Sequence, residues 1–312
     1  MLLSVVIPCY NEEENVSLFY KTIVDVFGPL MRKTELVFVN DGSTDKTYEQ
    51  LQKIYTKSPY RIKVVSFSRN FGKEAALLAG LRNTEGDMTA IIDADLQQRP
   101  EYVLQMMDIL KEHPEYDAVA AYQEHRKEGK ALTFFKDCFY KIIDKVTDVE
   151  MVRSASDFRL LKRNVVDAIC NLPEKCRFSK GIFSWVGFNT YYMPDVVEER
   201  VHGTTKWSFW KLFAYAIDGI VAFSTTPLVA ASFAGLLLCV ISGLLMIWII
   251  VKTLIWGDPV AGYPTLASLL LLTSGIQLLC TGIIGQYLAK NYIETKNRPV
   301  YVVKDILDSS KR

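Results

Sequence analysis

Cysteine and histidine are scarce in this sequence, and neither is spaced as metal ligands require. The 312 residues include six cysteines and three histidines. No two cysteines form a Cys-x-x-Cys pair, and we interpret all six as reduced packing residues. Lysine and arginine do not gather on any one element, so a nucleic-acid partner is not expected. The chain also lacks internal repeats and low-complexity tracts.

Charged side chains are missing from two long stretches in the C-terminal part. None occurs from Leu228 to Val251 or from Leu266 to Ala289. Each run can cross a hydrocarbon layer ~30 Å thick at ~1.5 Å per residue. We therefore predict two transmembrane helices within 227–291, joined as a hairpin. A pair of buried core helices is the alternative, although such helices rarely stay uncharged over this length.

Cations flank the predicted hairpin unevenly. The connecting loop carries only Lys252 against Asp258, whereas cations precede the first uncharged run and follow the second. These are Lys206, Lys211, Lys290, Lys296, Arg298 and Lys304. The positive-inside rule then predicts that the preceding domain and both termini are cytoplasmic. Residues 206–226 are expected to form an interfacial amphipathic segment, or else a plain core helix. Residues 292–312 are expected to form a cytoplasmic tail, in which Tyr301–Val303 could pair with a neighbouring chain.

Strand and helix patterns alternate along the N-terminal part of the chain. Apolar runs at 2–8, 35–40, 62–67 and 88–92 read as strands, and turn signals and helical patterns separate them. This alternation predicts an α/β domain with a mostly parallel sheet. A polar cluster follows each strand, and ligands of such sheets bind at the carboxyl ends of the strands.

The last of these clusters sets Asp93 and Asp95 one residue apart. Side chains two residues apart on an extended segment point the same way, so the two carboxylates could share a divalent cation. An Asp-x-Asp tripeptide often occurs by chance, and the surrounding motifs decide its meaning.

These motifs resemble a known enzyme family. They are a Pro-x-Tyr-Asn-Glu turn from Pro8, Asp-Gly-Ser from Asp41, Arg-Asn-x-Gly-Lys from Arg69, and Asp-Ala-Asp-Leu-Gln from Asp93. Together they resemble the GT-A nucleotide-diphospho-sugar glycosyltransferases of family 2. Ser156–Leu160, Lys180-Gly181, Ser184–Gly187 and Glu199–Trp207 resemble the branch that acts on polyprenyl phosphate, which includes bactoprenol glucosyltransferases and dolichol-phosphate mannosyltransferases. Gln98 departs from the family, which usually has an acidic residue there.

The resemblance implies a Rossmann-like GT-A catalytic domain over 1–205 and a role for each matched residue. Asp93, Asp95 and Gln97 would hold Mg²⁺ or Mn²⁺. The nucleotide-sugar would meet Pro8, Tyr10, Asn11, Glu12, Asp41, Arg69, Lys73, Asp93 and Ala94. Among these, Asp41 would read the base or ribose with Pro8, Tyr10 and Glu12.

The catalytic set implied by the resemblance is Asp157, Asp95, Arg200 and Lys206. Asp157 could act as a base, or it could orient Arg159 or the sugar. Cations would cancel the repulsion between the lipid phosphate and the diphosphate, because guanidinium and ammonium groups bind phosphate oxygens. The candidates are Arg126, Lys130, Arg159, Arg200 and Lys206.

The implied reaction is an inverting transfer of a hexose from a UDP-sugar to undecaprenyl phosphate. It would take place in a homo-oligomer at the bacterial plasma membrane. Glucose is the expected sugar, and N-acetylglucosamine from UDP or mannose from GDP are the alternatives. A processive polysaccharide synthase would normally show a Gln-x-x-Arg-Trp motif, which is missing here. A non-enzymatic scaffold is the remaining class, and the retained carboxylates argue against it.

Overall fold

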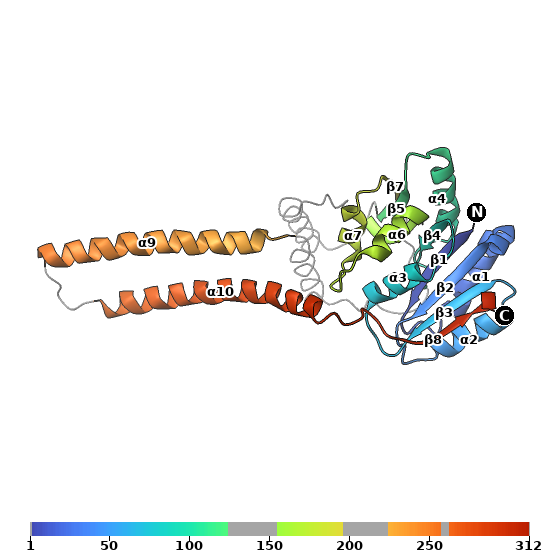
Figure 1. The fold of residues 1–312 in the computed structure, drawn as a ribbon, viewed down its shortest axis with the longest axis horizontal. Helices are drawn as coiled ribbons and strands as arrows, with labels where there is room; N and C mark the ends of the chain where they lie inside the picture. The colour runs from blue at the N-terminus through green and yellow to red at the C-terminus, as the bar shows by residue number, and fades with distance from the viewer. Residues whose placement is uncertain (1, 124–154, 196–223, 257–261, 312) are drawn as a thin grey trace.

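The computed structural model describes residues 2–123, 155–195, 224–256 and 262–311 (Figure 1). An eight-stranded sheet runs in the order β7-β5-β6-β4-β1-β2-β3-β8. Its strands are β1 (Leu3–Cys9), β2 (Thr34–Asn40), β3 (Arg61–Phe67), β4 (Met88–Ile91), β5 (Ala118–Gln123), β6 (Ala155–Lys162), β7 (Thr190–Asp195) and β8 (Val303–Asp308). Among the described residues, six strands of this sheet point the same way, and β6 and β8 are antiparallel to them. The prediction of a mostly parallel sheet is therefore confirmed.

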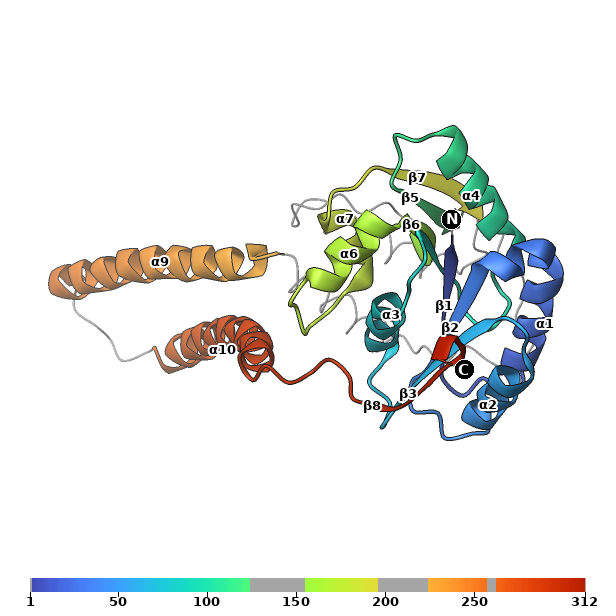
Figure 2. The same cartoon turned by 45° about the vertical axis from the view of Figure 1, so that its right-hand side comes forward.

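Helices cover both faces of the sheet (Figure 2). On one face lie α1 (Val16–Phe27), α2 (Thr47–Lys57) and α4 (Glu101–Glu112). On the other lie α3 (Lys73–Arg82), α6 (Arg163–Asn171) and α7 (Ser179–Trp185). Short 3₁₀ helices, η1 (Gly28–Lys33) and η2 (Ser309–Lys311), precede β2 and follow β8. The result is a three-layer α/β/α domain.

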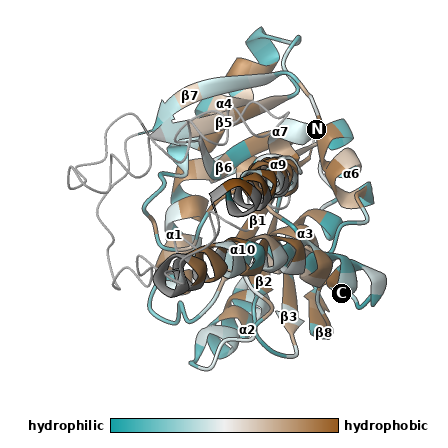
Figure 3. Ribbon diagram, turned by 90° about the vertical axis from the view of Figure 1, so that its left-hand side faces the viewer, coloured by the Kyte–Doolittle hydropathy of each residue, from teal (hydrophilic) through white to brown (hydrophobic). Residues whose placement is uncertain are grey.

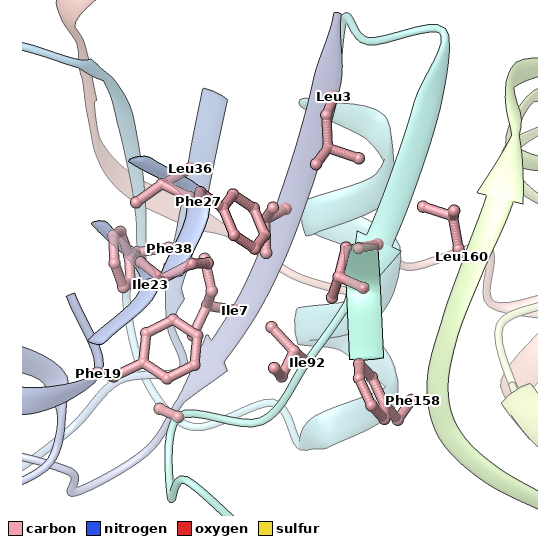
Figure 4. Close-up of a cluster of buried hydrophobic side chains, with 14 of the residues drawn as sticks. Leu3, Ile7, Phe19, Ile23, Phe27, Leu36, Phe38, Ile92, Phe158 and Leu160 are labelled. Atoms are coloured by element: carbon pink, nitrogen blue, oxygen red, sulfur yellow. The ribbon is translucent and has the colours of Figure 1, made fainter. Parts of the chain in front are cut away.

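The spacing of apolar residues explains how each helix meets the sheet. In α1, Val16, Phe19, Ile23 and Phe27 are buried and recur every three or four residues, so they share one face of the helix. Figure 4 shows part of this cluster, in which Phe19 and Phe27 lie over the apolar side chains of β1 and β2. The apolar side chains of β1 and β2 that they cover fix the register of these strands, because a one-residue slip would turn those side chains to the other face of the sheet.

The C-terminal residues form part of the same sheet. Strand β8 pairs antiparallel with β3, with Val64 opposite Leu307, and Tyr301 stacks on Phe67 at 4.9 Å between ring centroids. The sequence indicated a separate tail here and allowed Tyr301–Val303 to pair with a neighbouring chain. The structure instead uses the strand that follows, within the chain, to cover the exposed edge of β3, where unpaired backbone groups would otherwise invite association.

Two long helices, α9 (Thr226–Trp256) and α10 (Tyr263–Thr295), extend to one side of the domain. They lie side by side, and the Tyr287 hydroxyl donates to the Ser224 carbonyl at 2.5 Å. Figure 3 shows that both are largely apolar. Their large apolar side chains are exposed, with Phe233 at 66% and Leu278 at 72%. Water-soluble monomers rarely expose apolar surface of this extent.

The predicted pair of helices is therefore present, but its membrane-spanning character is only partly supported. Within the described ranges, one segment, Thr226–Leu245 of α9, is long and apolar enough to cross a membrane by the usual criteria. A second span in α10 remains a prediction. The predicted interfacial segment 206–226 lies almost entirely outside the described residues.

Candidate active site

Four loops meet at one edge of the sheet, where β1 to β4 end. Hydrogen bonds join the loop after β1 to the loop after β2. The backbone N–H of Asn11 donates to Ser43 Oγ at 3.0 Å, and Asn11 Oδ1 accepts the backbone N–H of Thr44 at 2.9 Å. The Glu12 N–H donates to Thr47 Oγ1 at 2.8 Å. Asn11 and Glu12, both predicted to bind the nucleotide, thus also hold these two loops together.

Asp41 ties the loop after β2 to the loop after β3. Its side chain is buried, and its carboxylate accepts the backbone N–H groups of Phe71 at 2.7 Å and Gly72 at 3.0 Å. Burial raises the pKa of Asp41, and these two donors partly offset that effect. The structure thus gives Asp41 a role in shaping the loop that carries Lys73. Its predicted contact with the base or ribose stays a prediction.

The other predicted nucleotide residues lie around the same edge. Tyr10 is 39% exposed just beyond β1, and Pro8 occupies the end of that strand beside Val39 of β2. The Arg69 guanidinium lies 4.3 Å from the centroid of the Phe71 ring, a cation–π distance. These positions are consistent with one binding face formed by three loops.

Gly42 permits the close contact between two of these loops, which leads to a first prediction. Its φ is +61°, and a Cβ there would lie 2.2 Å from the Arg69 carbonyl carbon. Gly187 is a matched control, with φ +71° and no atom nearer than 4.0 Å. Alanine at either position costs ~1–2 kcal/mol for the left-handed backbone, and at Gly42 a further ~1–3 kcal/mol for displaced neighbours.

We expect Gly42→Ala to lower the free energy of unfolding clearly more than Gly187→Ala. Thermal unfolding of the purified full chain in detergent measures the difference. Equal destabilisation by the two variants would show that the 42–69 contact is looser than the structure indicates.

The Asp-x-Asp loop follows β4, and its side chains point alternately toward the core and toward the surface. Ala94 is buried in the core cluster, whereas Asp93 and Asp95 are half-buried. Asp95 Oδ1 accepts the Gln97 N–H at 3.2 Å, and Leu96 has a positive φ of 58°. This tight turn holds both carboxylates at the edge where the other three loops meet.

Gln98 explains the departure from the family pattern noted in the sequence. Its side chain is buried, and its Oε1 accepts the Asp93 N–H at 3.1 Å. An amide oxygen can accept this bond without adding a further negative charge beside the two carboxylates. Gln98 therefore stabilises the predicted metal-binding loop. The residues around Gln98 in the sequence did not indicate this role.

Lys73 joins two acidic residues that are far apart in sequence. Its Nζ lies 2.9 Å from Asp93 Oδ2 and 3.1 Å from Asp157 Oδ2. Lys73 begins α3, while Asp157 belongs to β6, the strand next to β4. The side chain of Asp157 is 19% exposed and that of Lys73 is 45% exposed, so the pair is accessible from one side.

Electrostatics keep Lys73 and Asp157 charged. Burial alone would raise the pKa of Asp157, but Lys73, Lys180 and Arg159 outweigh it and lower that pKa to about 2. Burial opposes the charge on Lys73, yet the carboxylates of Asp93 and Asp157 raise its pKa above the ordinary lysine value. Asp157 is therefore a carboxylate at neutral pH and a weak base in this setting.

Arg159 is buried and lies two residues after Asp157 on β6. It is 6% exposed, its guanidinium carbon lies 3.6 Å from the centroid of the Phe183 ring, and Nη2 donates to the Ser156 carbonyl at 2.7 Å. Burial lowers the pKa of Arg159 to about 10, against the effect of Asp157. Its Nε has no hydrogen-bond partner among the described residues. Its recorded partners are thus Ser156 and Phe183, and both its predicted relation with Asp157 and its predicted phosphate contact remain predictions.

Sequence reasoning missed Glu74, the residue that follows Lys73. Its Oε2 accepts the Ser179 backbone N–H at 2.8 Å and also the Ser179 hydroxyl at the start of α7. Burial raises the pKa of Glu74, and the hydrogen bonds from Ser179 oppose this. No local sequence pattern could have indicated this contact, because the partners are separated by over a hundred residues.

Four predicted site residues lie outside the described residues: Arg126, Lys130, Arg200 and Lys206. Of the residues predicted to meet the lipid acceptor, the structure therefore describes Asp157 and Arg159 alone.

The donor chemistry at Asp93 and Asp95 fits a divalent cation that is shared with a bound diphosphate. The described residues contain no cluster of three or more His, Cys, Asp or Glu side chains that could enclose a metal. Mg²⁺ is often bound through one or two carboxylates, with substrate phosphates and water completing its coordination. Lys73 already places an ammonium cation on Asp93, which shows that this position favours positive charge. The predicted ligation by the Gln97 side chain stays a prediction.

A separate hollow of about 560 Å³ lies at the opposite edge of the sheet, lined in part by Asp87, Lys162 and Arg163. It contains none of the predicted site residues, and the carboxyl edge described above is the better candidate for catalysis.

The fold and site define an α/β transferase of the GT-A type, in which a Rossmann-like mixed sheet presents an Asp-x-Asp loop beside another carboxylate. Residues 4–170 match the family named Glycosyl transferase family 2. The chain belongs to this family, and it is a glycosyltransferase.

Similar proteins extend over nearly the whole chain. An uncharacterised glycosyltransferase of Synechocystis is 42% identical over 305 residues, which cover 97% of this chain and 95% of that protein. A prophage-derived bactoprenol glucosyl transferase of Shigella flexneri is 40% identical over 97% of this chain and 98% of its own. Among solved structures, glucosyl-3-phosphoglycerate synthase of Mycobacterium tuberculosis aligns with a TM-score of 0.49 and 20% identity, over 70% of this chain and 76% of that one.

Proposed function

We propose that this enzyme transfers glucose from UDP-glucose to undecaprenyl phosphate, with inversion at the anomeric carbon. The observation that carries the proposal is the Lys73 contact, which brings the Asp-x-Asp loop and Asp157 into one site. The relatives named bactoprenol glucosyl transferase support the lipid acceptor and the sugar, because they match this chain along α9 and α10 as well. UDP-N-acetylglucosamine and GDP-mannose are the alternative donors.

The acceptor supplies its own nucleophile. A phosphate monoester has a second pKa near ~6, so it is mostly dianionic at neutral pH and needs no general base. A phosphate oxygen forms a bond to the anomeric carbon while the bond from that carbon to the diphosphate breaks, and the electron pair leaves with UDP. Asp157, with its lowered pKa, suits positioning of Lys73 better than proton removal.

The remaining barrier is charge on the leaving group. A Mg²⁺ or Mn²⁺ ion, when bound through Asp93 and Asp95, would neutralise negative charge that develops on the diphosphate. Lys73 lies where its ammonium group can add to this stabilisation, since it already contacts Asp93. Asp41 supports the arrangement indirectly because it fixes the loop that leads into α3.

Helices α9 and α10 support membrane attachment as part of this proposal. The apolar segment Thr226–Leu245 and the exposed leucines of α10 favour a hairpin in the bilayer. With this placement, residues 1–205 form the cytoplasmic catalytic domain, 206–226 the interfacial segment, 227–291 the two spans and 292–312 the cytoplasmic C-terminal region. A homo-oligomer in the bacterial plasma membrane remains part of this proposal.

Transfer to lipid is the direct test of the donor and acceptor. Purified full-length enzyme would be incubated with undecaprenyl phosphate and, in turn, labelled UDP-glucose, UDP-N-acetylglucosamine or GDP-mannose, with Mg²⁺ or Mn²⁺ present. We expect label in the organic phase with UDP-glucose, and its loss in excess EDTA. Preferential labelling from another donor would correct the sugar, and labelling from none would refute the lipid acceptor.

The topology yields a second prediction. Gly262 precedes α10 on the side distant from the catalytic domain, and Ser310 follows β8. In intact cells, a membrane-impermeant thiol reagent should label Gly262→Cys but not Ser310→Cys, because the cations flank the hairpin on the cytoplasmic side. The unsubstituted enzyme controls for the native cysteines. Labelling at Ser310→Cys alone would place the catalytic domain away from cytoplasmic nucleotide-sugars.

A further inference from the structure

The end of α10 makes a specific contact with the catalytic domain. Glu294 lies in the last turn of this helix and is half-buried, whereas Tyr292, Ile293 and Thr295 around it are exposed. Glu294 Oε1 accepts the backbone N–H of Lys175 at 2.8 Å and that of Cys176 at 2.8 Å. Its Oε2 lies 3.1 Å from the same Lys175 nitrogen. A carboxylate that accepts two backbone N–H groups makes strong, directional hydrogen bonds.

These two donors belong to the segment 172–178, which joins α6 to α7. Arg177 stabilises the segment from within, since its guanidinium donates to the carbonyls of Ile169 at 3.1 Å and Leu172 at 3.3 Å. At its far end the segment reaches Ser179, which donates to Glu74 of α3. The segment is therefore held between a carboxylate of the helical hairpin and a carboxylate of the catalytic domain.

This chain of contacts ends at the site itself. Glu74 follows Lys73, whose ammonium group contacts Asp93 and Asp157. Lys180, directly after Ser179, helps to lower the pKa of Asp157. A displacement of 172–178 would therefore alter the surroundings of Asp157, on the acceptor side of the proposed site.

The position of α10 matters because the proposed acceptor is confined to the bilayer. Its phosphate would lie at the membrane surface, so the position of the catalytic domain relative to that surface decides whether the phosphate reaches the site. Asn297, with a φ of +48°, turns the chain just after α10, and the next regular element, β8, begins only at Val303. The far end of this connection is held to the sheet, because the Ser68 N–H donates to the Val302 carbonyl at 3.0 Å and Tyr301 stacks on Phe67. Glu294 holds the near end, at the helix itself.

We propose that Glu294 is a positioning residue that fixes the catalytic domain against the end of α10, so that a membrane-embedded lipid phosphate reaches Asp157. The inference rests on the proposed function, since it assumes a lipid acceptor. It assigns to the hairpin a second task beyond anchoring, namely alignment of the acceptor side of the site.

The test compares Glu294→Ala with Glu294→Gln and with Asn291→Ala, an exposed position one turn earlier on the same helix. Each full-length enzyme is reconstituted in vesicles that contain undecaprenyl phosphate. The measured quantities are KM for the lipid, Kd for UDP, and hydrogen exchange of the amides in 172–178. Loss of charge-assisted hydrogen bonds should raise the lipid KM of Glu294→Ala about tenfold.

We expect UDP binding to be unchanged in Glu294→Ala, exchange in 172–178 to be faster, and Glu294→Gln to recover part of the loss because its amide oxygen can still accept. Asn291→Ala should match the unsubstituted enzyme. An unchanged lipid KM in Glu294→Ala would overturn the inference, as would equal weakening of lipid and UDP binding, which indicates general damage. No lipid product from the unsubstituted enzyme would instead refute the proposed function, and this inference with it.

Discussion

Asp95→Ala is expected to lower kcat/KM for sugar transfer at least ~10²-fold, comparable to deletion of one group that stabilises transition-state charge. Asp95 lies in the tight turn after β4, where Leu96 has a positive φ and the Gln97 N–H fixes the carboxylate. Its removal would leave Asp93 as the one aspartate of the motif, and Asp93 also contacts Lys73. Binding of UDP in the presence of Mn²⁺ should weaken as well.

Steady-state kinetics and calorimetric titration with UDP and Mn²⁺ measure these effects. Asp108→Ala is the matched control, because Asp108 is an exposed aspartate on α4 that pairs with Lys111 at the surface. Such surface pairs contribute little, so this variant should retain full activity. Transfer by Asp95→Ala that equals that of the unsubstituted enzyme and persists in excess EDTA would rule out a metal at this loop.

Lys73→Met should cause the second large loss, ~10²-fold or more in kcat/KM, because it removes a cation from between two carboxylates and from the leaving-group side of the site. Methionine keeps much of the length and apolar body of lysine without its charge. Two further changes are expected. UDP should bind more weakly, and Mn²⁺ alone should bind more tightly, since Lys73 no longer competes for Asp93.

Lys73→Arg serves as the control, since it preserves the charge while changing the shape of the donor group. We expect it to lose less activity than Lys73→Met. Calorimetry with UDP and, separately, electron paramagnetic resonance with Mn²⁺ distinguish the two effects. Normal transfer by Lys73→Met would mean that the contact with Asp93 and Asp157 has no role in catalysis.

The sequence was sufficient to predict four adjacent strands of the sheet. Strands β1 to β4 are continuous apolar runs with turn signals at their ends, which is the pattern of buried parallel strands. Their alternation with helices then placed Asp41, Arg69, Lys73 and Asp93 at one edge, and the structure confirms this placement. Such predictions succeed because each depends on local periodicity and on one general rule about ligand position.

Contacts between distant segments were beyond the reach of such patterns. The approach of Lys73 to Asp157 depends on β6 joining the sheet beside β4, a pairing between residues some seventy positions apart. The resemblance supplied Asp157 as a site residue but not its cationic partner. In the same way, Glu74 gains its role from Ser179, which only the folded chain brings near. Gln98 is different, because its partner Asp93 lies five residues away and the turn between them makes the contact.

The partner of the C-terminal strand β8 could not be predicted for a different reason. Val303–Asp308 mixes apolar and charged residues, as an edge strand does, and its partner could not be inferred from its own pattern. Its pairing with β3 arises because that edge of the sheet would otherwise be open. The chain thus returns from the hairpin to the catalytic sheet, which the division into domain, spans and tail did not anticipate.

Mass spectrometry of the lipid after incubation with UDP-glucose tests the central claim most directly. The full-length enzyme, undecaprenyl phosphate, UDP-glucose and Mg²⁺ would be combined, and the lipid and water-soluble products analysed together. We predict a lipid heavier by a single hexose unit, with one UDP released for each lipid modified. Free glucose with unmodified lipid would show hydrolysis in place of transfer, and a series of added hexoses would show a processive synthase; either result would contradict the account.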